Sequence, residues 1–417
     1  MFPGDFARLT PDKDAVVMED GRRISYAELD ERSMRLAQLL HSRGLRPGDT
    51  FAVLLENTPI YYDVYWAALR SGLYLTSINR YSKKDEVAHI LADSESKALV
   101  TSPPYLEVAA AAVAEVPEVT VKLVVADQPM AGFEPFEAAL TASPAEPIEG
   151  EPRGDVMQYS SGTTGQPKGI RRPLTGLAVG ADGVRTAAGF CRRPLGMDEN
   201  SIYLMPAPLY HAAGLQWSTA LHEIGGTTVV MQKFDAEQFL QLIERERVTH
   251  TQVVPTMMIR LLDLPAEVRT KYDLSSLQRM TTSAAPCPPQ VKRDMVEWLG
   301  PIVDEYYAGT ESNGLTYITA RESLERPGSV GRALTGIIHI CDEEGNEVPA
   351  GQAGTLYFER EGQVFSYHRD EAKTRAAHHP DHPTWSTLGD MGYVDEDGYL
   401  YLTDRRSFTI ISGGVNI

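Results

Sequence analysis

Apolar and polar positions along the first half of the chain follow one another in blocks that predict helices and strands in turn. Ser25 and Glu28 form a capping-box signature, and the apolar residues after them recur at helical spacing up to Gly44. Residues 51–55 form a short continuous apolar run, which is typical of a strand covered on both faces. The apolar positions of the predicted first helix are Leu29, Leu36, Leu39 and Leu40.

The alternation of helix and strand continues to about residue 255. Asp235 and Gln238 mark the start of a further helix, ahead of an apolar strand at 249–255. Strands that alternate with helices form parallel sheets, so the pattern predicts a layered α/β fold. Other predicted helices lie at 59–69, 83–93 and 105–115, and other predicted strands at 72–78, 97–101 and 121–127.

The pattern changes beyond about residue 328, where short strands alternate with Gly and Asp turns. This alternation of short strands and turns predicts a small β-rich subdomain. The chain then ends on a strand and a glycine turn at 407–417, whereas a natural terminus is more often a docked helix or a polar tail. We therefore expect a further C-terminal domain that this chain does not include.

Composition and charge narrow the classes of protein. A hydrophobic content of 42% in 417 residues can build two or three globular units. No apolar run approaches the ~20 residues that cross a bilayer, and no leader pattern opens the chain, so we expect a cytoplasmic protein. A net charge of −18 argues against a nucleic-acid-binding surface. Cys191, Cys287 and Cys341 have no paired spacing, and we expect buried thiols in a reducing compartment.

Residues 159–169, Tyr-Ser-Ser-Gly-Thr-Thr-Gly-Gln-Pro-Lys-Gly, concentrate glycines, hydroxyls and a lysine. Glycines let backbone amides approach a polyphosphate, hydroxyls add donors, and Lys168 adds a point charge. The string is not a Walker A loop, because glycine rather than Ser or Thr follows Lys168. A ligand-free surface loop would explain a shorter match. The candidate phosphate-binding residues are the glycines Gly162, Gly165 and Gly169 and the hydroxyl residues Ser161, Thr163 and Thr164.

The whole eleven-residue string resembles the phosphate loop of the acyl-adenylate-forming (AMP-binding) superfamily, and within it the acyl-CoA synthetase or fatty-acid–CoA ligase branch. Segments at 205–215, 283–289, 305–312 and 388–406 resemble further motifs of that family in matching order. The resemblance implies a layered αβαβα large domain with two mostly parallel sheets plus a small β-barrel-like subdomain. It implies two α/β subdomains in residues 1–330, the β-rich subdomain in 331–404, and a hinge with the truncated start of a missing domain in 405–417.

The same resemblance assigns roles to individual residues. Tyr307 is expected to stack on adenine, Asp390 to bind both ribose hydroxyls, and Glu311 to hold Mg²⁺, with Thr163 as a weaker ligand. The implied catalytic residues are Thr163, Lys168, His211, Thr310 and Glu311. The implied ATP-binding residues are Ser160, Ser161, Gly162, Thr163, Thr164, Gly165, Lys168, Ser283, Ala284, Ala285, Pro286, Glu305, Tyr306, Tyr307, Ala308, Gly309, Thr310, Asp390 and Arg405. The implied acyl pocket is formed by His211, Ala212, Gly214, Trp217, Thr256, Met257 and Gly309, with Ser283 beside them.

The implied reaction is attack of a carboxylate on the α-phosphorus of ATP, which gives an acyl-AMP, followed in the full-length enzyme by thioester formation with coenzyme A. ATP, Mg²⁺, coenzyme A and a small carboxylic acid are the expected ligands. Two alternatives stay open: a catalytically impaired adenylate-binding homologue, and a ligase that hands its acyl group to a carrier protein. An acid with a medium or long acyl chain, an aryl acid and a sterol-derived acid all stay open as the substrate, and a homodimer is one option for the oligomeric state. Without its C-terminal domain, we expect the chain to show little activity.

The sequence departs from the family pattern in places. Ser407 and Phe408 stand where the family has its charged hinge, which puts the domain swing in doubt. Ala308-Gly309 replaces a glycine and a bulkier residue, which opens space at the base of the acyl pocket. The histidine-rich run at 378–382 matches no metal motif and is interpreted as a polar surface loop.

Overall fold

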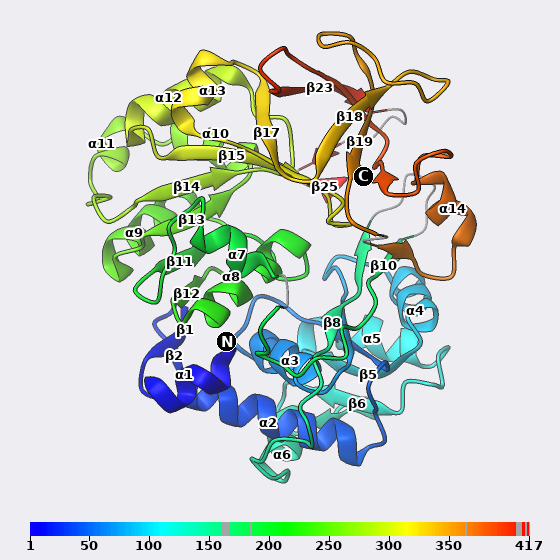
Figure 1. The fold of residues 1–417 in the computed structure, drawn as a ribbon. Coiled ribbons are helices and arrows are strands. Elements are labelled where there is room, and N and C mark those ends of the chain that lie inside the picture. The colour runs from blue at the N-terminus through cyan, green and yellow to red at the C-terminus, as the bar shows by residue number, and fades with distance from the viewer. Residues whose placement is uncertain (161–166, 184–185, 363–364, 406–410, 413–414, 417) are drawn as a thin grey trace. The chain divides into compact units, whose positions relative to one another are not determined.

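The computed structural model describes residues 1–417 except 161–166, 184–185, 363–364, 406–410, 413–414 and 417. The described residues divide into two compact units, residues 1–160 with 167–233, and residues 234 onward. Figure 1 shows the first unit in blue to green and the second in green to red. The predicted boundaries at 330 and 404 are a different division of the chain, and they stay a prediction.

A six-stranded parallel sheet lies at the centre of the first unit, in the order β7-β6-β5-β3-β4-β8. All positions of β3 and β4 are buried, as the apolar run at 51–55 predicted for a strand covered on both faces. The strands are β3 (Thr50–Leu54), β4 (Tyr74–Ser77), β5 (Ser96–Thr101), β6 (Val121–Val124), β7 (Glu134–Pro135) and β8 (Asp155–Val156).

A second group of strands in the first unit has the order β11-β12-β1-β2. β11 (Ile202–Met205), β12 (Thr227–Val230) and β1 (Asp14–Met18) are parallel, and β2 (Arg23–Ser25) is antiparallel to β1. A hairpin of β9 (Gln158–Ser160) and β10 (Lys168–Arg171) completes the strands of this unit.

The helices predicted after Ser25 and at 59–69, 83–93 and 105–115 are present, and each begins within one residue of the predicted start. Ser25 caps the second helix, because its hydroxyl accepts from the Glu28 amide at 3.2 Å while the Glu28 carboxylate accepts from the Ser25 amide at 2.9 Å. The chain turns away at Gly44, whose φ of +93° lies in the left-handed region. The helices are α1 (Pro3–Leu9), α2 (Tyr26–Ser42), α3 (Ile60–Leu69), α4 (Lys84–Asp93), the 3₁₀ turn η1 (Pro103–Tyr105), α5 (Leu106–Val113), α6 (Phe136–Thr141), α7 (Ala187–Arg192) and α8 (Ala212–Ile224).

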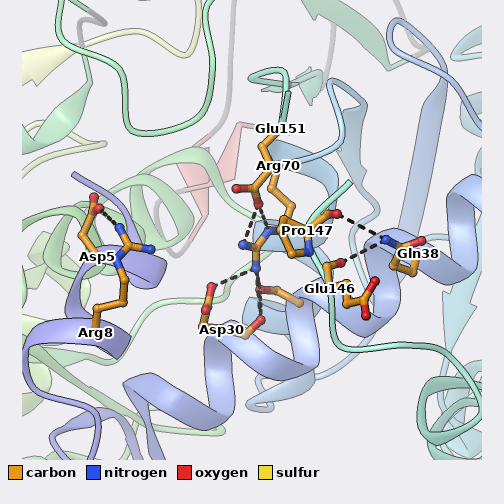
Figure 2. Close-up of polar contacts among 9 residues, drawn as sticks. Asp5, Arg8, Asp30, Gln38, Arg70, Glu146, Pro147 and Glu151 are labelled. Atoms are coloured by element: carbon orange, nitrogen blue, oxygen red, sulfur yellow. Dashed lines mark hydrogen bonds and ion pairs between the residues drawn. The ribbon is translucent and has the colours of Figure 1, made fainter. Parts of the chain in front are cut away.

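An irregular segment, residues 142–154, runs from α6 to β8 and is tied to α2 and α3 by side chains (Figure 2). Arg70 is only 3% exposed, and its guanidinium bonds Glu151 at 2.7 Å as well as the Asp30 carboxylate at 2.9 Å. The amide of Gln38 donates to the backbone carbonyls of Glu146 and Pro147. These bonds fix the segment that leads into β8 and then into the β9–β10 hairpin.

The second unit begins with three parallel strands, β13, β14 and β15, and continues as an antiparallel series in the order β15-β16-β17-β23-β22-β19-β18. The strands are β13 (His250–Val253), β14 (Arg279–Thr282), β15 (Val303–Ala308), β16 (Leu315–Ile318), β17 (Ser329–Thr335), β18 (Ile337–Cys341), β19 (Gly354–Glu359), β20 (Ser366–Tyr367), β21 (Trp385–Ser386), β22 (Asp390–Val394), β23 (Leu400–Arg405), β24 (Ile411–Ser412) and β25 (Val415–Asn416). The helices are α9 (Ala236–Glu246), α10 (Pro255–Leu262), α11 (Ala266–Arg269), α12 (Pro289–Leu299), α13 (Ala320–Glu325) and α14 (Glu371–Ala376).

The predicted fold class is confirmed: parallel strands joined by helices form most of the chain, and short antiparallel strands follow. Two local expectations were wrong. Cys287 is only half-buried, whereas Cys191 and Cys341 are buried. His379, predicted to lie in a polar surface loop, is 3% exposed, because its ring packs against Trp385 and Tyr357.

Candidate active site

Residues 161–166 of the phosphate loop predicted at 159–169 lie outside the described residues, but the hairpin that carries the loop is defined. Lys168 opens β10 and pairs in register with Ser160 at the end of β9. The Tyr159 hydroxyl donates to Asp93 on α4 at 2.5 Å, which anchors β9. Beyond β10, Arg172 bonds the Asp155 carboxylate at 2.7 Å. The hairpin is thereby fixed to other parts of the first unit, next to the loop by Tyr159 and at the far end of β10 by Arg172.

The segment 206–211 brings His211 to the start of α8, where it is the N-cap residue. A buried asparagine that the sequence analysis missed holds this segment. The side chain of Asn57 donates to the carbonyl of Ala207 at 3.0 Å and to that of Met231 at 2.8 Å, and it accepts from the amide of Leu209 at 2.9 Å. A polar residue that follows a fully buried strand, as Asn57 follows β3, was the available signal.

His211 is uncharged at neutral pH. Burial lowers the pKa of its imidazole from 6.5 to about 4. Its ring centroid lies 4.4 Å from that of Tyr210, and its Nε2 atom has no hydrogen-bond partner among the described residues. A buried imidazole nitrogen without a partner is able to meet a polar group of a ligand without bringing a charge to it.

The remaining first-unit residues of the predicted acyl pocket lie on the first turns of α8. Trp217 is buried, and its ring contacts Phe190 edge-on with centroids 5.3 Å apart. Gly214 sits where a Cβ atom would approach the Pro208 carbonyl oxygen to 2.6 Å, so the close fold of segment 206–211 over α8 requires glycine. Ala212 is half-buried on the same helix.

In the second unit, two predicted nucleotide residues from distant parts of the sequence meet. The hydroxyl of Tyr307, near the end of β15, donates to Oδ2 of Asp390, the first residue of β22, at 2.5 Å. Asp390 is 5% exposed, and the Tyr307 ring is stacked on Phe358 with centroids 6.3 Å apart. In the sheet register, Asp390 pairs with Arg405 of β23. Residues assigned to adenine and ribose are therefore neighbours.

Glu311 lies in the turn after β15, the strand that carries Tyr307. Its side chain is 8% exposed, and Oε1 accepts from the Tyr367 hydroxyl at 2.9 Å. Gly309 lies where a Cβ atom would meet Leu388 at 2.1 Å and the Glu311 carboxylate at 3.2 Å, so any larger residue would disturb that carboxylate. Thr310 and Ala308 are half-buried in the same turn. Carboxylate oxygens are ligands that Mg²⁺ prefers.

Two buried polar clusters each include one residue of β15. Glu305 and Lys292 of α12 form an ion pair at 3.3 Å, and burial raises the pKa of Glu305 above its ordinary value although Lys292 opposes the shift. Ser283 accepts from the amide of Gln252, which also donates to Tyr306. Lys292 and Gln252 are not among the residues predicted from the sequence. Of the other predicted residues, Ala284, Ala285 and Pro286 follow Ser283, and Thr256 and Met257 lie in the first turn of α10.

Comparison with known families gives a match over residues 5–368 to the model described as "AMP-binding enzyme". The chain belongs to the AMP-binding enzyme family. This match confirms the family resemblance predicted from the sequence motifs. In the residues that the structure describes, this AMP-binding enzyme has no helix with both the length and the apolar character that a membrane span requires.

Several curated proteins resemble this AMP-binding enzyme over almost its whole length. A 2-succinylbenzoate–CoA ligase of Bacillus licheniformis is 29% identical over 99% of this chain and 80% of its own length. An indoleacetate–CoA ligase of Aromatoleum aromaticum is 31% identical, with 99% and 79% covered. The fatty acid–[acyl-carrier-protein] ligase ScoC of Streptomyces coeruleorubidus is 29% identical, with 99% and 78% covered.

Solved structures share the fold of this AMP-binding enzyme. O-succinylbenzoate coenzyme A synthetase from Bacillus subtilis, solved in complex with AMP, aligns with a TM-score of 0.79 at 27% identity, over 99% of this chain and 80% of that one. The mixed α/β fold with its parallel sheets is thus that of adenylate-forming enzymes.

Proposed function

We propose that this protein activates a carboxylic acid with ATP as an acyl-AMP and transfers the acyl group to the thiol of coenzyme A. The contact between Tyr307 and Asp390 is the observation that carries the proposal. An aromatic face is able to stack on a purine, and one carboxylate is able to accept hydrogen bonds from two vicinal ribose hydroxyls. Two such groups in contact, in a family named for AMP binding, fit a nucleoside better than any other ligand.

The first step joins two anions, so the site has to reduce their repulsion and align them. Lys168 supplies positive charge at the end of the hairpin, and the loop residues Ser161, Gly162, Thr163, Thr164 and Gly165 are proposed to surround the phosphates with amides and hydroxyls. Thr310 is proposed to bond the α-phosphate. Holding the carboxylate in line with the α-phosphorus then converts an encounter into a unimolecular step, without a protein nucleophile.

Mg²⁺ is part of the proposal. The buried carboxylate of Glu311 suits a hard cation, since Tyr367 orients one oxygen by a hydrogen bond and the turn at Gly309 has no room for a competing side chain. When bound there, the ion would neutralise charge on the phosphates. Thr163 is proposed as a weaker ligand.

His211 is proposed to contact the reacting carboxylate or the phosphate as a neutral imidazole. Burial keeps the pKa of His211 near 4, so the side chain adds no charge to an acyl pocket proposed to be mostly apolar. The relatives are named for acids that contain an aryl ring or a fatty chain, and an apolar pocket suits such groups. The proposed pocket is formed by Ala212, Gly214, Trp217, Thr256, Met257 and Gly309.

The proposal also concerns the acceptor of the acyl group and the location of the protein in the cell. Coenzyme A is favoured because two of the three relatives are CoA ligases, and a carrier-protein thiol is the alternative because the third is an acyl-carrier-protein ligase. A cytoplasmic location fits the three free cysteines. Low activity of this chain without a further C-terminal domain, and a role in fatty acid metabolism, stay predictions.

The test is pyrophosphate release by the full-length protein from ATP and Mg²⁺ with a panel of aryl, fatty and sterol-derived acids. We expect release only when an acid is present, and thioester with AMP when coenzyme A is added. Asp390→Asn should weaken ATP binding roughly 10- to 100-fold, because a charged acceptor for two hydroxyls is lost. Thioester on a carrier protein but not on coenzyme A would favour the alternative acceptor. ATP binding without release for any acid would favour an impaired homologue.

A further inference from the structure

A buried amide next to the proposed site has one end bonded and the other end unbonded. Gln252, near the end of β13, is 4% exposed. Its Nε2 atom donates to Ser283 Oγ at 2.9 Å and to the Tyr306 hydroxyl at 2.5 Å. Its Oε1 atom has no hydrogen-bond partner among the described residues, although it is shielded from solvent.

Such an atom is unusual, because buried side-chain oxygens are nearly always hydrogen-bonded. A buried acceptor left unpaired lowers the free energy of unfolding of the free protein. A ligand donor that reaches this acceptor makes a hydrogen bond without displacing one that the protein already has. The two ends of a glutamine amide exchange by a half-turn about the last side-chain bond, and Ser283 and Tyr306 would accept either end because hydroxyls both donate and accept. A ligand hydroxyl satisfies the free end in both orientations for the same reason.

The position of Gln252 favours the acid rather than the nucleotide as the source of that hydroxyl. Successive side chains of a strand point to opposite faces, so Tyr306 and Tyr307 of β15 lie on opposite sides of the sheet. Tyr307 contacts Asp390, and these residues are assigned to adenine and ribose. Gln252 contacts Tyr306 on the other face. The resemblance assigns Tyr306 and Ser283 to the nucleotide, but it also places Ser283 beside the acyl pocket, and Ser283 is the second partner of Gln252. The helix α10, with Thr256 and Met257 of that pocket, follows Gln252 directly in the chain.

We propose that Gln252 selects acids that carry a hydroxyl group in their acyl portion, by bonding that hydroxyl with the end of its amide that the protein leaves unpaired. The substrates would then be hydroxylated aryl or fatty acids rather than purely apolar ones. This inference rests on the proposed acid activation. It assigns a specificity role to a residue that the family motifs of the sequence did not contain.

The test compares pairs of stable adenylate mimics, acyl-sulfamoyl adenosines, that differ in one hydroxyl. The pairs are 4-hydroxycinnamoyl and cinnamoyl, 4-hydroxyphenylacetyl and phenylacetyl, and 12-hydroxydodecanoyl and dodecanoyl. Calorimetry gives their dissociation constants for the wild type, Gln252→Met and Gln252→Glu. Gln241→Met, which replaces an exposed glutamine of α9, is the matched control. Thermal unfolding identifies any variant that fails to fold.

We expect the hydroxylated member of at least one pair to bind the wild type roughly tenfold or more tightly than its partner. Gln252→Met, which has a similar shape but no acceptor, should bring that ratio to within about twofold, whereas Gln252→Glu and Gln241→Met should retain the preference. Equal binding within every pair, or a preference that survives in Gln252→Met, would overturn the inference. So would an equal loss for both members of each pair together with weaker ATP binding, because that pattern indicates a contact with adenine.

Failure of the inference and failure of the proposed function give different results. If the mimics bind and acids release pyrophosphate but hydroxyls make no difference, only the role of Gln252 is wrong. If no mimic binds and no acid releases pyrophosphate, the proposed acid activation is wrong, and the inference falls with it.

Discussion

The hydroxyl of Tyr307 donates a hydrogen bond to the carboxylate of Asp390, across a separation of 83 positions in the sequence. Tyr307 reaches this position from the end of a parallel strand, whereas Asp390 opens an antiparallel strand of the β-rich segment. The proposed nucleoside site therefore depends on two kinds of sheet meeting within the second unit. Removing the hydroxyl of Tyr307 and the ring of Tyr307 in separate variants tests this proposed site.

Tyr307→Phe should bind ATP within a few-fold of the wild type, since the ring face that stacks on adenine is kept. Tyr307→Ala should weaken ATP binding roughly 10- to 100-fold, because stacking of a base on an aromatic ring is worth about 1–3 kcal/mol. Calorimetric titration with ATP measures both. Equal losses in the two variants would mean that the hydroxyl, and not the ring, makes the important contact.

Asn57→Ala should destabilise the first unit and disorder the approach to His211. Three hydrogen bonds to segment 207–209 and Met231 are lost in a buried site, so we expect a loss of about 2–4 kcal/mol in the free energy of unfolding. Urea denaturation measures the loss, and Asn346→Ala, at an exposed turn, should change it by less than about 0.5 kcal/mol. A similar small change for both variants would show that Asn57 does not hold the segment.

His211 should make stability depend on pH between about 4 and 6.5. Its pKa is lower in the folded protein than in the unfolded chain, so the unfolded chain binds more protons in this range and stability falls as the pH falls. Between pH 7 and pH 5 the loss from this residue should be on the order of 2 kcal/mol. His211→Gln should flatten that part of the profile in urea denaturation. A profile as steep as that of the wild type would contradict the assignment.

Gly309→Ala should impair acid-dependent pyrophosphate release by roughly tenfold or more, because the new methyl group would displace Leu388 and press on the Glu311 carboxylate. The matched control is Gly189→Ala in α7, where a Cβ atom meets nothing within 4 Å. That change should preserve activity and add about 0.5–1 kcal/mol of helix stability. Unchanged activity in Gly309→Ala would mean that the tight turn is not needed to place Glu311.

Much of this fold could be predicted from local patterns. The capping box of Ser25 and Glu28 and the apolar run of β3 are signals contained in a few adjacent residues, and both are confirmed. The family could be predicted because several of its motifs occur in matching order along this one sequence. The family match over residues 5–368 confirms that prediction.

The contacts that depend on distant residues could not be predicted in this way. Asn57 belongs to no recognisable sequence motif, because its partners at 207–209 and 231 lie more than a hundred positions away. The sequence does not distinguish Gln252 from other strand residues. Only the folded structure shows that its amide is buried and that the Oε1 atom has no hydrogen-bond partner among the described residues. His379 was misjudged because the packing of Trp385, rather than local polarity, sets its burial. Burial and pairing are properties of the folded chain.

Following one oxygen atom tests the proposed acid activation most directly. An acid labelled with ¹⁸O in its carboxylate is incubated with the protein, ATP, Mg²⁺ and coenzyme A, and the nucleotide product is analysed by mass spectrometry. If the carboxylate attacks the α-phosphorus and the thiol then attacks the carbonyl carbon, AMP gains one ¹⁸O and pyrophosphate gains none. Unlabelled AMP, or label in phosphate beside ADP, would contradict an acyl-adenylate intermediate.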